Sequence, residues 1–159
     1  MKKKQAIMKS SVLPYIQLIS RCFYGLGFII PVLDRIGWLG APGTGIVAWG
    51  TWENFQNYTH TLLPFLSKPI SDSFGFGATL LEAVFGICLM IGFKTKWVSL
   101  GGALITFMFA LSMIANYGIG APFKYPVFVF TSLGLLLFCV NDYKWSIDAL
   151  LKNRKQSVL

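Results

Sequence analysis

Four long runs of apolar residues, separated by polar or glycine-containing segments, set the pattern of this chain. The runs cover residues 12–33, 74–93, 97–116 and 124–141. A helix that crosses a membrane needs about 20 mostly apolar residues, because the hydrocarbon layer is about 30 Å thick and a helix rises about 1.5 Å per residue. The runs are continuous rather than alternating, which favours helices over the strands of a membrane barrel. We therefore expect an all-α fold, an integral membrane four-helix bundle.

The segment between the first two runs, residues 34–73, predicts an additional helix. Glycine and proline make its first part irregular. Within residues 47–66, one set of side chains recurs at intervals of three or four: Trp49, Trp52, Phe55, Thr59, Leu62 and Leu66. Polar residues fall on the opposite face: Glu53, Asn57 and His60. This pattern predicts an amphipathic helix that lies in the membrane interface, caps the bundle or covers a site, and that ends or bends at Pro64.

The two ends of the chain flank these runs. Residues 142–159 form a C-terminal amphipathic segment, in which residues 142–151 predict a short helix along the membrane surface, capped by Ser146 or Asp142. The lysines before the first run resemble the start of a signal peptide, but that run is too long, contains Arg21 and lacks a small-x-small cleavage site after it. We expect it to be retained as the first helix of a single domain that covers residues 1–159.

Composition supports a membrane protein. Of the 159 residues, 55% are hydrophobic and only 13% are charged, whereas a soluble domain carries roughly a quarter charged residues. The 14 Lys and Arg residues outnumber the 6 Asp and Glu residues. They lie at the ends of apolar runs rather than along a polar face, which argues against nucleic acid as the partner. The lipid bilayer is the partner that the composition predicts.

Basic residues gather on one side of the predicted spans. That side holds Lys2, Lys3, Lys4, Lys9, Lys94, Lys96, Lys144, Lys152, Arg154 and Lys155, with Asp142 and Asp148 as its acids. The other side holds Arg35, Lys68 and Lys124, balanced by Asp34, Glu53 and Asp72. Short loops rich in Lys and Arg stay in the cytoplasm. We therefore expect the bacterial cytoplasmic (inner) membrane, with both termini cytoplasmic.

Arg21 and Glu82 are the two charges well inside the predicted spans. Counted along their helices, their depths differ by only about 3 Å, so antiparallel neighbours would bring them together near mid-membrane. An unpaired Arg or Asp costs about 2.5–3.5 kcal/mol at a helix centre, so we expect the two to pair. The residues predicted to line a slot around this pair are Gln17, Tyr24, Gly25, Gly86, Thr106, Tyr125 and Ser132.

The sequence leaves two roles open for the Arg21–Glu82 pair, a clamp between the first two helices or a catalytic site. Other chemistry has less support. The three cysteines lack CxxC spacing, which favours packed thiols. A single histidine, His60, excludes a multi-histidine metal site or a bis-histidine haem within the chain. We find no metal, flavin or haem motif, and no phosphate-binding glycine loop.

Three stretches of the chain combine into a recognisable pattern. In the first stretch, Arg21 of the first run is followed by Gly25. The second, residues 81–96, combines the acidic Glu82, a glycine four positions on, a glycine at the helix end and a basic turn. The third, residues 145–148, closes the domain. Together, over residues 12–150, they resemble the DoxX family of small four-helix membrane proteins. The resemblance implies the fold and the membrane setting. Because the family takes its name from subunits of a thiosulfate:quinone oxidoreductase, it also implies quinone-linked redox chemistry with a partner subunit.

Three functional hypotheses follow. In the first, the chain is a membrane subunit that holds a quinone or similar apolar ring ligand for a partner oxidoreductase, with Arg21 polarising a carbonyl oxygen and Glu82 carrying the proton. In the second, it is a non-catalytic assembly subunit whose pair is only a clamp. In the third, it is a small carrier or lipid-interacting protein, which the lack of matching charges in the two halves of the chain disfavours. We favour the first, and the sequence does not decide whether the chain is itself an enzyme.

Overall fold

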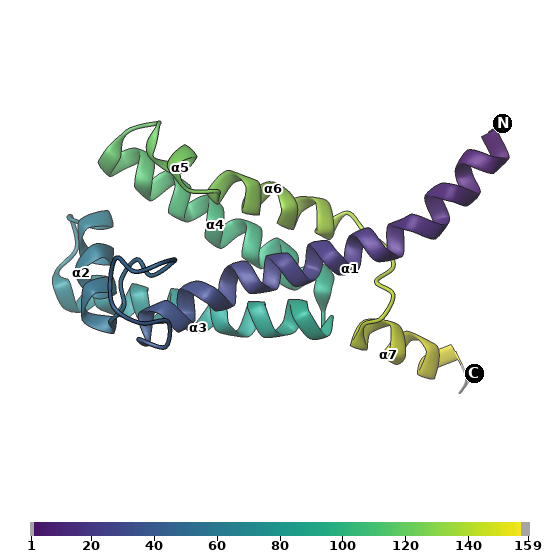
Figure 1. Cartoon of the computed structure of the whole chain (residues 1–159), viewed down its shortest axis with the longest axis horizontal. Helices are drawn as coiled ribbons and strands as arrows, with labels where there is room; N and C mark the ends of the chain where they lie inside the picture. Colours follow the sequence, from purple (N-terminus) through teal and green to yellow (C-terminus); the bar gives the residue numbers. More distant parts are fainter. Residues whose placement is uncertain (1, 157–159) are drawn as a thin grey trace.

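Figure 1 shows the fold in a computed structural model, which describes the backbone of residues 2–156 and the side chains of residues 12–154. The helices are α1 (Lys2–Arg35), α2 (Trp52–Leu62), α3 (Lys68–Ile91), α4 (Thr95–Tyr117), α5 (Ala121–Lys124), α6 (Val127–Phe138) and α7 (Ile147–Gln156). No strand occurs in this described part of the chain. The predicted all-α fold is confirmed over these residues.

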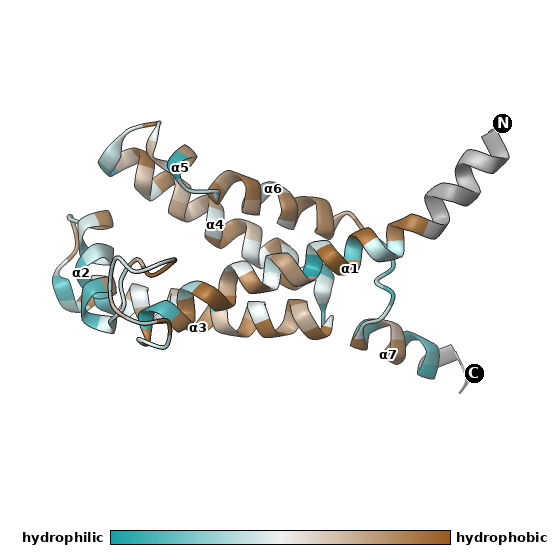
Figure 2. Cartoon of the chain, viewed as in Figure 1, coloured by the Kyte–Doolittle hydropathy of each residue, from teal (hydrophilic) through white to brown (hydrophobic). Residues whose placement is uncertain are grey.

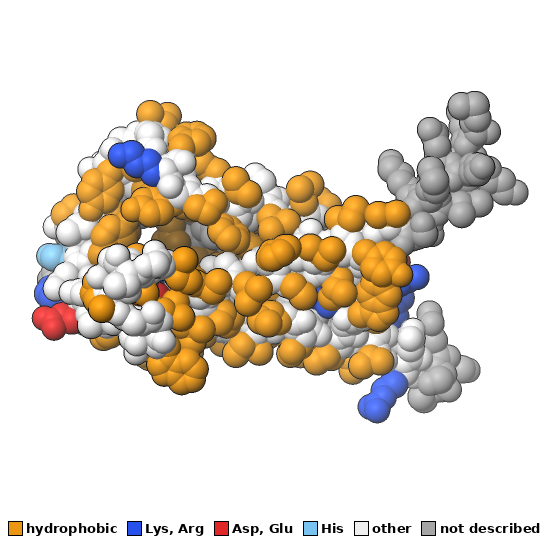
Figure 3. Space-filling model, viewed as in Figure 1, with side chains coloured by type: hydrophobic (Ala, Val, Ile, Leu, Met, Phe, Trp, Pro, Cys, Tyr) orange, Lys and Arg blue, Asp and Glu red, His pale blue; other side chains and the backbone are white. Residues whose placement is uncertain are grey.

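Three of the helices, α1, α3 and α4, are long and apolar enough to cross a membrane. Their candidate spans are Val12–Arg35, Lys68–Ile91 and Thr95–Tyr117. Many large hydrophobic side chains along them are exposed, among them Phe23, Phe74 and Met108. Figure 2 shows that hydrophobic residues run along the length of the bundle and that more hydrophilic ones gather toward its ends, and Figure 3 shows hydrophobic side chains spread over this face of the molecule. A surface of this kind indicates contact with lipid rather than with water.

The predicted fourth span, residues 124–141, is not one continuous helix. α5 ends at Lys124, Tyr125 is extended with φ −121° and ψ 146°, and α6 starts only after Pro126. The break has a local cause, because a proline restricts the residue before it to extended conformations and offers no N–H of its own. The 12 residues of α6 rise only about 18 Å, which is less than the thickness of the hydrocarbon layer.

The helices pack in two pairs, α1 with α3 and α4 with α6, and the pairs meet in an aromatic and aliphatic core. The core consists of Tyr24, Phe28, Leu89, Val98 and Leu137. α1 and α3 approach closely where Gly25 faces Gly86. A tight turn joins α3 to α4, and it begins at Gly92, whose φ of 71° lies in the left-handed region that glycine adopts without strain.

Shorter helices cover the two ends of the bundle (Figure 1). α2 lies against α3 at one end, which we name the α2 end, and α7 and the start of α1 lie at the other, the α7 end. The predicted amphipathic helix is confirmed as α2, which buries Phe55 and Thr59 and ends before Pro64. The terminal helix starts later than predicted, at Ile147, and the hydroxyl of Ser146 accepts the N–H of Ala149 at 3.1 Å, which confirms Ser146 as its cap.

The basic residues predicted on the side of the termini lie at the α7 end, as far as they are described. Lys94 and Lys96 belong to the turn between α3 and α4, and Lys144, Lys152 and Arg154 belong to the segment after α6. The side chains of the remaining five, Lys2, Lys3, Lys4, Lys9 and Lys155, lie outside the described residues.

Candidate functional site

Glu82 forms its ion pair with Arg35 and not with Arg21. Both side chains are buried, each residue being only 3% exposed. Arg35 Nη1 donates to the Glu82 carboxylate and also to the hydroxyl of Thr79 at 2.8 Å. The predicted contact between Arg21 and Glu82 is therefore wrong, although the chain does bury an Arg–Glu pair.

The register of α1 against α3 explains this difference. Gly25 lies opposite Gly86, so these two residues mark a common level in the antiparallel pair. Glu82 lies about one turn from that level toward the α2 end, whereas Arg21 lies about one turn from it toward the α7 end. Arg35 lies in the last turn of α1, at the α2 end, and its long side chain reaches back along the helix to Glu82.

Aromatic rings cover the guanidinium of Arg35. Its Cζ lies 4.0 Å from the centroid of the Phe55 ring and 5.2 Å from that of Trp49, within the range of cation–π attraction. Asp34 explains how Trp49 comes to lie there. Its buried carboxylate accepts three backbone N–H bonds, from Ala48 at 2.9 Å, Trp49 at 3.2 Å and Gly50 at 2.8 Å. The acid beside Arg35 thus folds the segment before α2 back over the end of α1.

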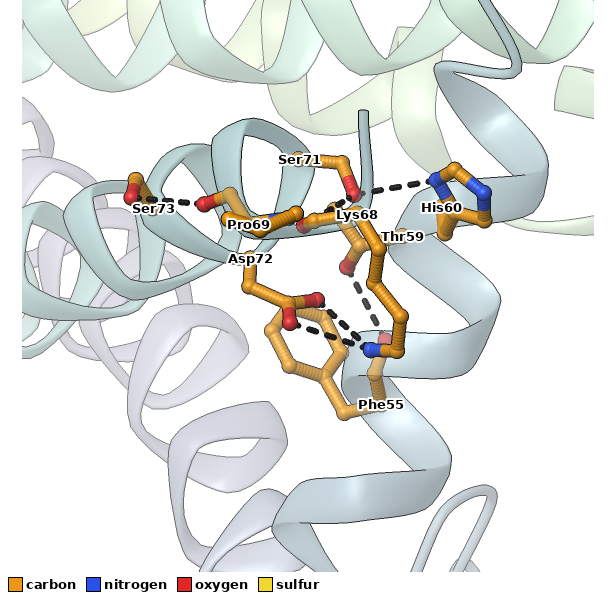
Figure 4. A network of polar contacts seen from close by, with 8 residues as sticks. All are labelled: Phe55, Thr59, His60, Lys68, Pro69, Ser71, Asp72 and Ser73. Carbon is orange, nitrogen blue, oxygen red and sulfur yellow. Dashed lines mark hydrogen bonds and ion pairs between the residues drawn. The ribbon is translucent and has the colours of Figure 1, made fainter. Parts of the chain in front are cut away.

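Contacts between α2 and the start of α3 fix this cover in place (Figure 4). His60 Nδ1 on α2 lies 3.1 Å from the hydroxyl of Ser71 on α3, and Lys68 pairs with Asp72 at 3.0 Å within the first turns of α3. A Cβ added to Gly75 would touch Phe55 at 3.3 Å, so α2 and α3 approach closely here. His60, the single histidine of the sequence, therefore contacts a hydroxyl of its own chain where α2 meets α3.

One buried hydrogen-bond donor of Arg35 is unpaired within the described residues. Its Nε has no hydrogen-bond partner among the residues described. A buried donor without a partner costs about 1–3 kcal/mol. Nε can therefore donate a hydrogen bond to an oxygen atom of a ligand, next to a carboxylate and against two aromatic rings.

Arg21 forms its hydrogen bond at the α7 end of the bundle. Its Nη2 donates to the backbone carbonyl of Trp145 at 2.8 Å, and Gln17 Nε2 donates to that of Lys144 at 2.9 Å. Both donors are buried on α1. These two bonds hold the segment between α6 and α7 against the first helix.

The other predicted slot residues separate into two groups. Tyr24, Gly25, Gly86 and Thr106 are buried, as Gln17 and Arg21 are. Ser132 is exposed, and Tyr125 is 59% exposed and lines a pocket of about 360 Å³ among α2, α4 and α5. Figure 3 shows the molecule hollowed between the α2 region and α4.

The break before Pro126 explains why Tyr125 and Ser132 do not lie with the buried slot residues of α1. α6 turns a different face inward from the one predicted, with Gly134 and Leu137 buried and Thr131 Oγ1 at 2.8 Å from Thr106 Oγ1. The predicted single slot is thus replaced by a buried stripe on α1 and a separate pocket at the α2 end.

Comparisons with known protein families, with curated proteins and with solved structures give no match to this chain. Two arrangements stand out, the Arg35–Glu82 pair under aromatic rings at the α2 end and the buried Arg21 at the α7 end. Of the two arginines, sequence reasoning missed Arg35 because it follows directly on the first apolar run; the Gly25–Gly86 pair is the signal that would have located it.

Proposed function

We propose that this chain is a DoxX-like, multi-pass subunit of a quinone-linked oxidoreductase in a bacterial cytoplasmic membrane, with its termini in the cytoplasm. In this proposal the ring ligand binds at the Arg35–Glu82 pair rather than at Arg21. The distribution of described basic residues at the α7 end supports the orientation. The resemblance to DoxX supports the class of partner.

The observation that carries the proposal is the buried pair itself. Ionisable residues inside a membrane protein are expensive and by default indicate function. Here the pair lies next to Trp49 and Phe55, and Arg35 Nε is free of protein partners in the described chain. A carbonyl oxygen on an aromatic-sized ring matches these features, because Nε can donate to the oxygen while the side-chain rings pack against the ligand ring.

The residues of the chain would then have separate tasks. A bound quinone supplies two-electron, two-proton redox chemistry, and the electrons come from the partner oxidoreductase. Arg35 holds and polarises the carbonyl oxygen, Glu82 holds a proton beside it, and Thr79 orients the guanidinium. Trp49 and Phe55 exclude water from the pair.

Fluorescence of Trp49 offers a direct test, because a quinone bound beside Arg35 quenches a nearby indole. The purified full chain in detergent micelles is titrated with a short-chain benzoquinone. We expect saturable quenching whose amplitude falls in Trp49→Phe and whose affinity is weakened at least tenfold in Arg35→Gln. Trp97→Phe, which removes an exposed indole at the opposite end, serves as the matched control and keeps the saturable signal. Absence of saturable quenching in the wild type, or unchanged affinity in Arg35→Gln, would reject the proposal.

A second candidate function is a non-catalytic assembly subunit in which the pair acts as a clamp. The observation in its favour is that Arg35, from α1, contacts Phe55 of α2 and both Thr79 and Glu82 of α3, and so joins three helices. In that case Arg35→Gln lowers stability, the wild type shows no saturable quenching, and a partner protein copurifies with the chain regardless of quinone.

A further inference from the structure

The pocket at the α2 end is lined by phenols and one lysine. Its polar lining comes from separate elements: Tyr58 from α2, Tyr117 from α4, Lys124 from α5, and Tyr125 from the break before Pro126. No acidic residue is among its described lining residues. Its volume of about 360 Å³ lies within the range of pockets that hold small ligands.

Hydrogen bonds between α2 and the end of α4 hold the walls of this pocket in place. The Tyr117 hydroxyl lies 2.7 Å from that of Thr61, and Asn116 Nδ2 donates to the Leu62 carbonyl at 2.8 Å. The Thr61 hydroxyl donates its proton to the Tyr58 carbonyl at 2.7 Å, so Tyr117 is the donor in its contact with Thr61. The Tyr117 proton is therefore already used within the protein.

Three other donors of the pocket are free to bind a ligand. Lys124 Nζ and the hydroxyls of Tyr58 and Tyr125 form no hydrogen bond or ion pair with another residue in the described chain. Burial raises the pKa of the Tyr58 hydroxyl, and the neighbouring phenols of Tyr117 and Tyr125 raise it further. Tyr58 therefore keeps its proton and can donate it.

The pocket lies where lipid head groups are expected. Tyr117, one of its lining residues, is the last residue of the candidate span Thr95–Tyr117. Ile119 and Phe123, which adjoin the lining residues in sequence, are large apolar side chains with exposed fractions of 75% and 73%. Polar head groups meet the acyl chains at the end of a membrane span. A ligand with a polar head and an apolar tail matches both features.

The charge of the pocket selects the kind of head group. A phosphodiester carries one negative charge, which Lys124 balances, and its oxygens accept hydrogen bonds from an ammonium and from phenols. Lys124 repels a purely cationic ligand. The ammonium of a zwitterionic head group would find no carboxylate among the lining residues.

We propose that this pocket binds the head group of an anionic phospholipid, with its phosphodiester held by Lys124 Nζ and by the hydroxyls of Tyr58 and Tyr125. Because these residues belong to α2, to α5 and to the break after α5, the bound lipid joins segments that are far apart in sequence. The lipid binds the folded chain only and therefore stabilises it.

Thermal unfolding of the full chain in uncharged maltoside micelles tests this proposal. Dihexanoyl phosphatidylglycerol should raise Tm saturably, by roughly 5 °C at about 100 times its dissociation constant. Dihexanoyl phosphatidylcholine and inorganic phosphate, each at the same concentration and ionic strength, should give little or no rise. An equal rise with phosphatidylcholine would contradict selection for an anionic lipid, and an equal rise with inorganic phosphate would show a site for a free ion.

Variants locate the effect in the pocket. Lys124→Gln should lose most of the rise, whereas Lys68→Gln, a change of another exposed lysine at the α2 end, should keep it. Tyr125→Phe keeps the ring and the lysine but removes one donor, and it should weaken the apparent affinity about fivefold. Tyr125→Phe therefore decides the matter even if Lys124→Gln does not fold.

The proposal is overturned if Tm does not depend on phosphatidylglycerol, if Lys124→Gln keeps the full rise, or if Tyr125→Phe keeps the wild-type affinity. An equal loss in Lys68→Gln and Lys124→Gln would also overturn it, because general charge attraction would then explain the rise. The measurement uses no quinone and leaves Arg35 and Glu82 unchanged, so its outcome is independent of the proposed function.

Discussion

Gly25 of α1 and Gly86 of α3 lie face to face, so close that a Cβ on Gly25 would stand 2.8 Å from the carbonyl oxygen of Gly86. The reciprocal Cβ on Gly86 would stand 3.0 Å from the carbonyl oxygen of Gly25. Small residues allow this approach of two backbones within a membrane bundle. The contact fixes the relative height of the two helices, and it thereby brings Glu82 within reach of Arg35.

Enlarging Gly25 should weaken the bundle, because the added atoms meet backbone that cannot move aside cheaply. We expect Gly25→Ala to lower the free energy of unfolding by about 1–3 kcal/mol, as overpacking does elsewhere. Gly77→Ala is the matched control, since a Cβ there meets nothing within 4 Å. Thermal unfolding of both variants in detergent measures the difference, and equal effects of the two changes would contradict the close contact.

Asp148 should anchor the start of α7 to the turn between α3 and α4. Its carboxylate caps the first turn of α4 through Lys94 and Thr95, and its own N–H donates to the carbonyl of Gly92 at 3.0 Å. Asp148→Ala removes the cap and should cost about 1 kcal/mol. Hydrogen exchange should accelerate at Lys94 and Thr95 and across the segment before α7.

Asp142 provides the control for that change, since it is an exposed acid that pairs with Lys152 on the surface. Asp142→Ala should leave exchange in the turn between α3 and α4 unchanged. Equal acceleration in the two variants would show that the loss of an acid at this end, and not the cap, is responsible.

Tyr143 should make stability fall in alkaline solution. Burial raises the pKa of its hydroxyl from 10.0 to about 12, and the hydroxyl donates to the Leu137 carbonyl at 2.6 Å. Between pH 10 and 12 the unfolded chain releases this proton while the folded chain retains it, so the free energy of unfolding falls as pH rises. Tyr143→Phe should lose about 1 kcal/mol at neutral pH and show a shallower alkaline decline. Parallel Tm curves for the two proteins from pH 9 to 12 would contradict this assignment.

Much of the fold could be predicted because long apolar runs mark where the membrane-length helices lie, although α1 and α3 extend beyond their runs. The long helices α1, α3 and α4 follow from their runs, and α2 follows from aromatic residues at intervals of three and four. The last run was harder, since Pro126 interrupts an otherwise apolar stretch and shortens α6. Hydropathy does not register the conformational restriction that a proline imposes on the residue before it.

The candidate site was harder to predict because charge pairing depends on helix register. Counting residues from the ends of the runs placed Arg21 level with Glu82, and it treated Arg35 as a loop residue. The structure extends α1 to Arg35 and sets its height against α3 through Gly25 and Gly86. Arg21 then lies close to the end of the bundle, where a backbone carbonyl rather than a carboxylate receives its N–H group.

The pairing of Glu82 is the central claim, and a double-mutant cycle on unfolding free energy tests it most directly. Glu82→Gln is combined with Arg35→Gln in one cycle and with Arg21→Gln in another, so that the change at Glu82 keeps its side-chain shape and both cycles remove an arginine in the same way. We predict a coupling of about 2 kcal/mol or more between Arg35 and Glu82, and of no more than about 0.5 kcal/mol between Arg21 and Glu82. A strong coupling of Glu82 to Arg21, with none to Arg35, would contradict the account.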